Sequence, residues 1–103
     1  MDIQQLRAEV ISFRDQRNWG ALNTAKDLAI ALSIEAAELN ELFLWKTDAQ
    51  VGEMLGDRLV RERLADEMAD VFIYLLALSD RTEIDLAESV SLKLQKNALK
   101  YPV

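Results

Sequence analysis

The chain has 103 residues, enough for one hydrophobic core, so we expect a single domain over residues 1–103. Half of the residues are hydrophobic, and the net charge of −6 argues against a general nucleic-acid or anionic-membrane surface. The chain has no cysteine and no histidine, which excludes disulfides, thiolate zinc sites and histidine-based acid–base chemistry. Any metal site must therefore use oxygen ligands, which favour Mg²⁺, Mn²⁺ or Ca²⁺.

The first ten residues, MDIQQLRAEV, are polar and lack the apolar centre of a signal peptide. The longest strongly apolar run, residues 71–78, is far too short to cross a bilayer. We therefore expect a soluble, cytoplasmic protein without a membrane partner.

The first predicted helix begins after Asp2, which can cap it, and continues to about residue 17. Its apolar positions recur at steps of three and four: Ile3, Leu6, Val10 and Phe13. The following NWGALN stretch breaks the helix and places Trp19 near a turn. Asn23 or Thr24 can cap the next helix.

The second predicted helix, over residues 27–45, carries acids inside its apolar stripe. At ~100° per residue, Glu35 projects among leucines at its i−7, i−3, i+4 and i+7 positions. These are Leu28, Leu32, Leu39 and Leu42. Glu38 and Glu41 follow at steps of three, so an acidic edge runs beside an apolar face.

Residues 46–56 contain two of the three glycines and no sustained period. They predict a connecting loop, with at most a short helical turn at 51–55; a lid over a site is the less favoured interpretation. The helix that follows, over about 57–80, repeats the acidic pattern, with Asp70 three residues after Glu67. The apolar residues around Glu67, at the same four offsets, are Val60, Leu64, Val71 and Tyr74.

A carboxylate in an apolar stripe must be protonated, paired or bound to a cation, because burying its charge costs several kcal/mol. Our hypothesis is that the four acids converge when the two helices pack and together hold a divalent metal. They are Glu35, Glu38, Glu67 and Asp70. The alternative is two solvated helix faces, with the acids paired to Lys26, Arg61 or Arg63.

The end of this helix, VFIYLLAL, is apolar on all sides. In a lone four-helix domain only one face of the helix can be buried, so the other apolar side chains would stay exposed. We therefore expect a homodimer or a homotetramer. Asp85 with Glu88 can open a last helix, which Pro102 ends, giving an all-α fold of four helices. One face of that helix carries Lys93, Lys96, Asn97 and Lys100, either as a solvated face or as a grip for an anionic substrate.

The Glu35-x-x-Glu38 and Glu67-x-x-Asp70 motifs resemble those of the all-α nucleotide pyrophosphohydrolases of the MazG-like superfamily. The stretches FRDQRNW, ELFLWK, DVFIYLLAL and KNALKYP are similar to segments of its dCTP pyrophosphatase branch. The resemblance implies a four-helix bundle completed by oligomerisation. It also implies Mg²⁺-dependent hydrolysis of a nucleoside triphosphate, dCTP-like, to the monophosphate and pyrophosphate, as housekeeping of the nucleotide pool.

The resemblance also implies roles for single residues. The four motif acids would bind Mg²⁺, or Mn²⁺ as the alternative, with Glu35 and Glu38 as the catalytic pair and Glu41 as another candidate base. The implied contacts to the nucleobase are Trp19, Asn23, Trp45 and Tyr74, and those to the phosphates are Lys93, Asn97 and Tyr101.

The base preference and the choice between an enzyme and a non-catalytic protein both have alternatives. Asn23 stands where the best-known members of the branch have a histidine, so the base preference is not fixed, and Trp45 and Tyr74 are alternatively plain core residues. The rival to an enzyme is a helical dimerisation or regulatory module, in which the acids hold a structural metal or dock a basic partner.

Overall fold

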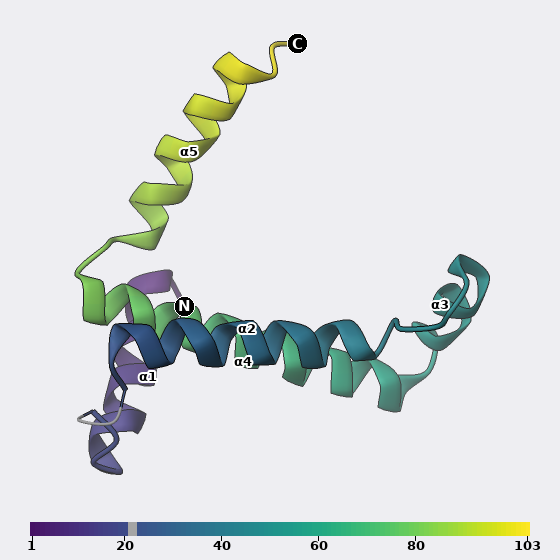
Figure 1. The fold of residues 1–103 in the computed structure, drawn as a ribbon, viewed down its shortest axis with the longest axis horizontal. Coiled ribbons are helices and arrows are strands. Elements are labelled where there is room, and N and C mark those ends of the chain that lie inside the picture. Colours follow the sequence, from purple (N-terminus) through teal and green to yellow (C-terminus); the bar gives the residue numbers. More distant parts are fainter. Residues whose placement is uncertain (21–22) are drawn as a thin grey trace.

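The computed structural model describes residues 1–20 and 23–103, and the regular structure of this part of the chain is entirely helical. In chain order the helices are α1 (Ile3–Gln16), α2 (Ala25–Glu41), α3 (Asp48–Met54), α4 (Arg58–Thr82) and α5 (Leu86–Lys100) (Figure 1). The all-α prediction and its four long helices are confirmed. The short α3 is an addition to them. None of the described helices is long and apolar enough to span a membrane.

The long helices begin where side-chain capping satisfies their free N–H groups. The Asp2 carboxylate accepts from the Gln5 N–H, and the Gln5 side chain accepts from the Asp2 N–H. Of the two candidate caps for α2, Thr24 is the one used. Asp57 and Asp85 cap α4 and α5 in the same way. Local capping chemistry therefore sets the start of every long helix.

The α3 helix replaces most of the loop that we expected at residues 46–56. Thr47 accepts from the Gln50 N–H, and the Gln50 side chain accepts from the Thr47 N–H, so a capping box starts the helix. The prediction of a plain loop was wrong because two reciprocal hydrogen bonds at the start of α3 outweigh the low helix propensity of Gly52.

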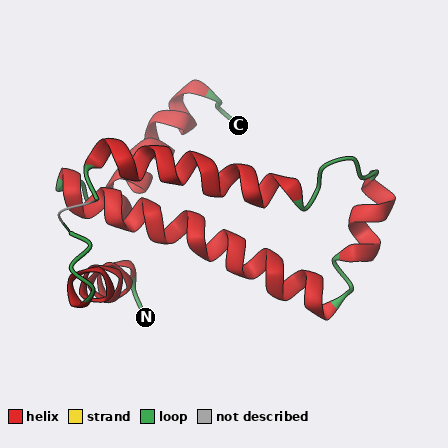
Figure 2. Cartoon of the chain, turned by 60° about the horizontal axis from the view of Figure 1, so that its bottom comes forward, coloured by secondary structure: helices red, strands yellow, loops and turns green. Residues whose placement is uncertain are grey.

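An antiparallel pair of α2 and α4 forms the centre of the molecule, joined at one end by α3 (Figure 2). The α1 helix packs on α4 near the opposite end, and α5 projects away from the pair (Figure 1). Among the described residues, the buried apolar side chains are Leu28, Leu42, Leu76 and Ala77, of which Leu28 and Leu76 are fully buried. The radius of gyration is 16.5 Å, whereas a compact domain of this length has about 13 Å. One copy of the chain is thus an open, extended structure.

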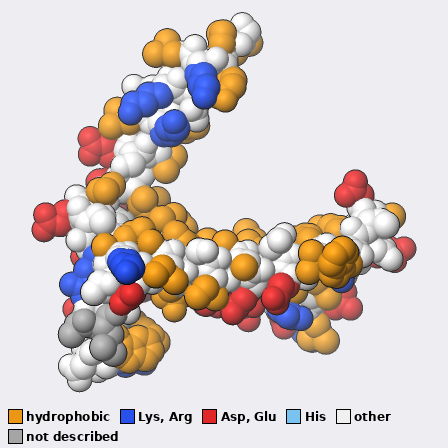
Figure 3. Space-filling view, viewed as in Figure 1, with side chains coloured by type: hydrophobic (Ala, Val, Ile, Leu, Met, Phe, Trp, Pro, Cys, Tyr) orange, Lys and Arg blue, Asp and Glu red, His pale blue; other side chains and the backbone are white. Residues whose placement is uncertain are grey.

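Large apolar side chains are exposed along the helices, as the orange areas of Figure 3 show. They include Ile30 and Ile34 on α2, Met68, Phe72 and Ile73 on α4, and Val90, Leu92, Leu94 and Leu99 on α5. The apolar stretch 71–78 is therefore divided, with some side chains buried and others exposed. Contiguous exposed apolar surface of this kind marks an interaction site.

Two arginines tie the end of α1 and the segment after it to the end of α4. The Arg14 side chain is 10% exposed, and its guanidinium donates to Asp80 Oδ2 over 3.2 Å. Arg81 donates to the backbone carbonyls of Gly20 and Asn23. These bonds hold the chain on both sides of residues 21–22, so Asn23 has a fixed place beside α4.

Replacing Asp80 by alanine should lower the free energy of unfolding by about 1–3 kcal/mol, because the buried Arg14 guanidinium would keep only its longer contact to the exposed Asp15. Urea unfolding followed by circular dichroism, at one fixed protein concentration, measures the change. Asp66→Ala, which removes an exposed acid from the same helix, is the control and should stay within about 0.5 kcal/mol of the parent. Equal effects of the two substitutions would contradict the role of the ion pair.

Candidate metal centre and the neighbouring cavity

Three of the predicted metal ligands meet between α2 and α4. Glu35, Glu38 and Glu67 each contribute one carboxylate oxygen to a group in which all lie within 4.8 Å of one another. The three-residue step on α2 places Glu35 and Glu38 on neighbouring positions of one face, and the antiparallel packing of α4 brings Glu67 opposite them. Glu35 and Glu67 are half-buried, whereas Glu38 is exposed.

Asp70, the fourth predicted ligand, lies beside this group rather than within it. Its side chain is exposed, one turn of α4 from Glu67. Its negative charge is nevertheless among the causes that raise the pKa of Glu35, which places it near the cluster.

The electrostatics of the cluster are unfavourable in the absence of a cation. Desolvation is the main cause that raises the pKa of Glu35 above its ordinary value, followed by the Glu38 carboxyl and the charges of Asp70 and Glu67. In the described part of the chain, Glu35 Oε2 and Glu67 Oε2 are buried and have no hydrogen-bond partner. Such orphaned acceptors are costly unless something positive contacts them.

Basic side chains do not neutralise these acids. Within residues 1–20 and 23–103, the ion pairs run from Arg14 to Asp15 and to Asp80, and none reaches the cluster. The alternative of acids paired with Lys26, Arg61 or Arg63 therefore finds no support in the structure. Clustered carboxylates with orphaned oxygens fit a hard divalent cation such as Mg²⁺.

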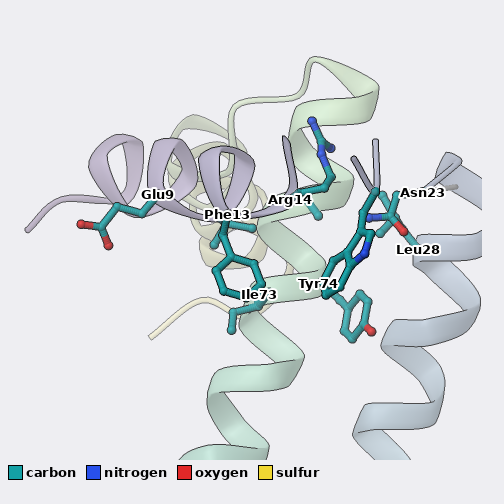
Figure 4. A pocket seen from close by; sticks show the side chains of 10 residues that line it. Glu9, Phe13, Arg14, Asn23, Leu28, Ile73 and Tyr74 are labelled. Atoms are coloured by element: carbon teal, nitrogen blue, oxygen red, sulfur yellow. The ribbon is translucent and has the colours of Figure 1, made fainter. Parts of the chain in front are cut away.

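A cavity of about 380 Å³ lies where α1 approaches the α2–α4 pair, about two helical turns from the cluster, since its lining residues Leu28 and Tyr74 are seven residues from Glu35 and Glu67. Its lining is mostly apolar and aromatic, and Figure 4 shows Phe13, Ile73 and Tyr74 around it. Trp19 packs edge-on against Phe13 with ring centroids 5.9 Å apart. Asn23 adds an amide group to this lining. Arg14 also borders the cavity, but its guanidinium points away from Phe13 and Tyr74 (Figure 4).

This cavity gathers Trp19, Asn23 and Tyr74 from the predicted nucleobase contacts, but not Trp45. Trp45 is 92% exposed and follows the opposite end of α2, in a left-handed backbone conformation with φ of 63°. The predicted phosphate contacts are also separate from the cluster in one copy of the chain. Lys93 and Asn97 lie on the projecting α5, and Tyr101 directly follows it (Figure 1).

Sequence reasoning missed two cavity-lining apolar residues and two arginines that hold the end of α1 and the following segment to α4. Phe13 was assigned to plain packing, and Ile73 was treated only as part of an apolar run, yet both line the cavity. Arg14 and Arg81 carried no sequence signal at all, because their partners are 58 to 66 residues away along the chain. A buried arginine in an amphipathic helix is evident only once the fold is known.

Comparison with known proteins gives consistent matches. The profile of the MazG-like family matches residues 30–103. The chain is 40% identical to dCTP pyrophosphatase 1 of Rattus norvegicus over 102 residues, covering 99% of this chain and 58% of that protein. It is also 40% identical to dCTP pyrophosphatase 1 of Homo sapiens over 101 residues, covering 98% of this chain and 58% of that protein. The chain thus spans less than two thirds of the length of these curated relatives.

A solved structure agrees with the fold. The crystal structure of a pyrophosphatase from Archaeoglobus fulgidus superposes with a TM-score of 0.89 at 42% sequence identity. The match covers 97% of this chain and 92% of the archaeal chain. Together with the family match over most of the sequence, it shows that the chain belongs to the MazG-like family, in the branch that is similar to dCTP pyrophosphatase 1.

Proposed function

We propose that the protein hydrolyses a nucleoside triphosphate, dCTP-like, to the monophosphate and pyrophosphate. The observation that carries this proposal is the unpaired, partly buried carboxylate cluster with an aromatic cavity about two helical turns away on the same helix pair. The names of the relatives, dCTP pyrophosphatase 1 and pyrophosphatase, support the same reaction. Its role would be housekeeping of the nucleotide pool.

Glu35, Glu38, Glu67 and Asp70 would hold Mg²⁺, with Mn²⁺ as the alternative ion. When bound, the cation supplies the positive charge that lets a triphosphate approach these carboxylates and polarises a water molecule. The buried oxygens of Glu35 and Glu67 fit the ligand role, because each needs a positive partner. Glu38 is the exposed member of the group, so we assign it the acceptance of the water proton.

The aromatic cavity would hold the base. Trp19 and Tyr74 offer ring faces, and stacking on such rings contributes ~1–3 kcal/mol per base while tolerating different bases. The Asn23 amide both donates and accepts, which fits a base edge that carries a donor and an acceptor, as cytosine does. Stacking would thus supply affinity, and the amide would fix the orientation of the base edge.

A homodimer or homotetramer would complete the site. The exposed apolar side chains of α2, α4 and α5 need a cover, and a second copy of the chain would also bring an α5 helix with Lys93, Asn97 and Tyr101. The large radius of gyration of one copy supports this assembly, since the open space beside α5 is otherwise solvent.

Purified protein with Mg²⁺ should convert dCTP to dCMP and pyrophosphate, and Glu38→Gln or Asp70→Asn should lower kcat/KM about 100-fold or more. Separation of the nucleotide products by chromatography, with a pyrophosphate assay, measures the reaction. Glu62→Gln, an exposed acid of α4 outside the cluster, is the matched control and should keep full activity. Release of orthophosphate alone would refute cleavage between the α and β phosphates. The absence of turnover with every dNTP would favour the non-catalytic module.

Mg²⁺ should raise the melting temperature more at pH 8 than at pH 5. The pKa of Glu35 is raised in the folded, metal-free protein. Above that pKa the ionised Glu35 side chain destabilises the fold. As the pH falls through the raised pKa, Glu35 becomes protonated and the destabilisation is lost. Protons and Mg²⁺ compete for the same carboxylate, so metal binding weakens in acid. Differential scanning fluorimetry at constant ionic strength measures both shifts.

Glu35→Gln is the matched variant for this experiment. It should raise the melting temperature of the metal-free protein at pH 8, because it removes a repelled charge, and it should shrink the Mg²⁺-induced shift. An equal Mg²⁺ shift at both pH values in the parent protein would rule out Glu35 as a ligand.

Light scattering at micromolar concentration should give at least twice the 11.7 kDa of one chain. Leu94→Glu would place a charge in the exposed apolar surface of α5 and should lower the mass, because a desolvated charge is costly in an interface. Lys96→Glu, which changes an already charged position of the same helix, serves as the control. A parent protein that stays monomeric would show that the apolar surface is not a self-association interface.

A further inference from the structure

The candidate metal centre belongs to a longer stripe of side chains on the helix pair, which we name the seam. On α4 the seam follows steps of four and three residues, and on α2 steps of seven, three and four, so each set lies on one face of its helix. Its α4 members are Arg63, Glu67, Asp70, Tyr74 and Ala77, and its α2 members are Leu28, Glu35, Glu38 and Leu42.

The seam has a cavity at each end. Leu28, Tyr74 and Ala77 line the aromatic cavity already described. At the other end, Leu42 and Arg63 line a second cavity of about 230 Å³. The acid cluster lies between the two cavities, one helical turn from Arg63.

The second cavity differs in chemistry from the first. It contains two cations, Lys46 and Arg63, together with the carboxylate of Glu41, which leaves one positive charge in excess. Within the described chain neither cation takes part in an ion pair, although Glu67 is four residues from Arg63 on the same helix. Lys46 is placed here by the turn at the end of α2, where its N–H donates to the Phe43 carbonyl. Two exposed cations from separate elements, neither of them in an ion pair, thus border one hollow.

The order along the seam follows the order of groups in a nucleoside triphosphate. Tyr74 and Arg63 are separated by eleven residues of α4, or about 16 Å along the helix axis. Long lysine and arginine side chains reduce the span that a ligand must cover. The aromatic cavity corresponds to the base, and the acid cluster corresponds to a metal-bridged phosphate. The cationic cavity corresponds to the terminal phosphate.

We infer that the second cavity is a subsite for the terminal phosphates of the substrate, held by Lys46 and Arg63, and that pyrophosphate occupies it after cleavage. This inference rests on the proposed function, since it extends the same site. It gives the site a direction, with the base beside Tyr74 and the phosphates toward α3. It also gives a reason for selecting triphosphates, because a monophosphate anchored by its base would not reach Arg63.

The test is equilibrium binding to the parent protein and to Lys46→Met and Arg63→Met, in Mg²⁺ at constant ionic strength. The ligands are α,β-imido-dCTP, which resists cleavage, and dCMP. Each substitution should weaken the triphosphate analogue about tenfold, as expected for the loss of one charge-assisted contact, and leave dCMP unchanged. Inorganic pyrophosphate should compete with the analogue less well in both variants.

Two exposed cations provide matched controls. Arg58 lies on α4 five residues before Arg63, about 140° around the helix, and Lys26 lies at the far end of α2. Arg58→Met and Lys26→Met should bind both ligands as the parent does. Circular dichroism and light scattering confirm that all variants keep the fold and the assembly.

The outcomes separate the two proposals. Equal weakening of dCMP and the triphosphate analogue, or unchanged binding of the analogue, would overturn the subsite even if the protein hydrolyses dCTP. Selective weakening of the analogue in a protein without turnover would support the subsite and refute the proposed reaction.

Discussion

Repulsion among carboxylates at the centre of the α2–α4 pair is the constraint on which the rest of the structure depends. Three carboxylate oxygens lie within 4.8 Å of one another, and two of the glutamates have a buried oxygen without a hydrogen-bond partner. Their mutual repulsion favours separation of the two helices. Apolar packing opposes it on both sides, through Leu28 and Leu76 toward one end and Leu42 toward the other. The fold thus holds the acids together, and a bound cation would relieve a cost already present in the folded chain.

A helix pair suits such a site because it converts spacing along the sequence into distance. Each step of three or four residues moves a side chain about 5 Å along the same face. Aromatic, acidic and basic groups placed at these steps therefore form a linear order without long loops. The backbones that carry the site residues are also constrained, since α2 and α4 contact each other at the acid cluster and spread apart only toward α3 (Figure 2). A mobile loop could not hold three repelling carboxylates so close together.

Local patterns were sufficient for much of the fold and for the centre of the site. The caps Asp2 and Asp85 and the glutamates inside apolar stripes are read within one or two turns of helix, and the structure has them as expected. What could not be read depends on contacts distant in sequence. The Arg14–Asp80 pair joins residues that are 66 positions apart, and no sequence periodicity predicts such a contact. The position of α5 could not be predicted either, because the sequence of an amphipathic helix does not identify the surface against which its apolar face packs.

The distribution of the aromatic residues limits what one copy of the chain can do. Trp19 and Tyr74 share a cavity at one end of α2, whereas Trp45 follows the other end, with a helix of 17 residues, about 25 Å long, between them. One nucleobase cannot contact Trp45 and Trp19 of the same copy. A tryptophan that is 92% exposed in a left-handed conformation is also a costly arrangement for an isolated chain. Trp45 can therefore meet a base stacked on Trp19 only if the tryptophan comes from another copy, and the exposed apolar faces of α4 and α5 are where such a copy would pack.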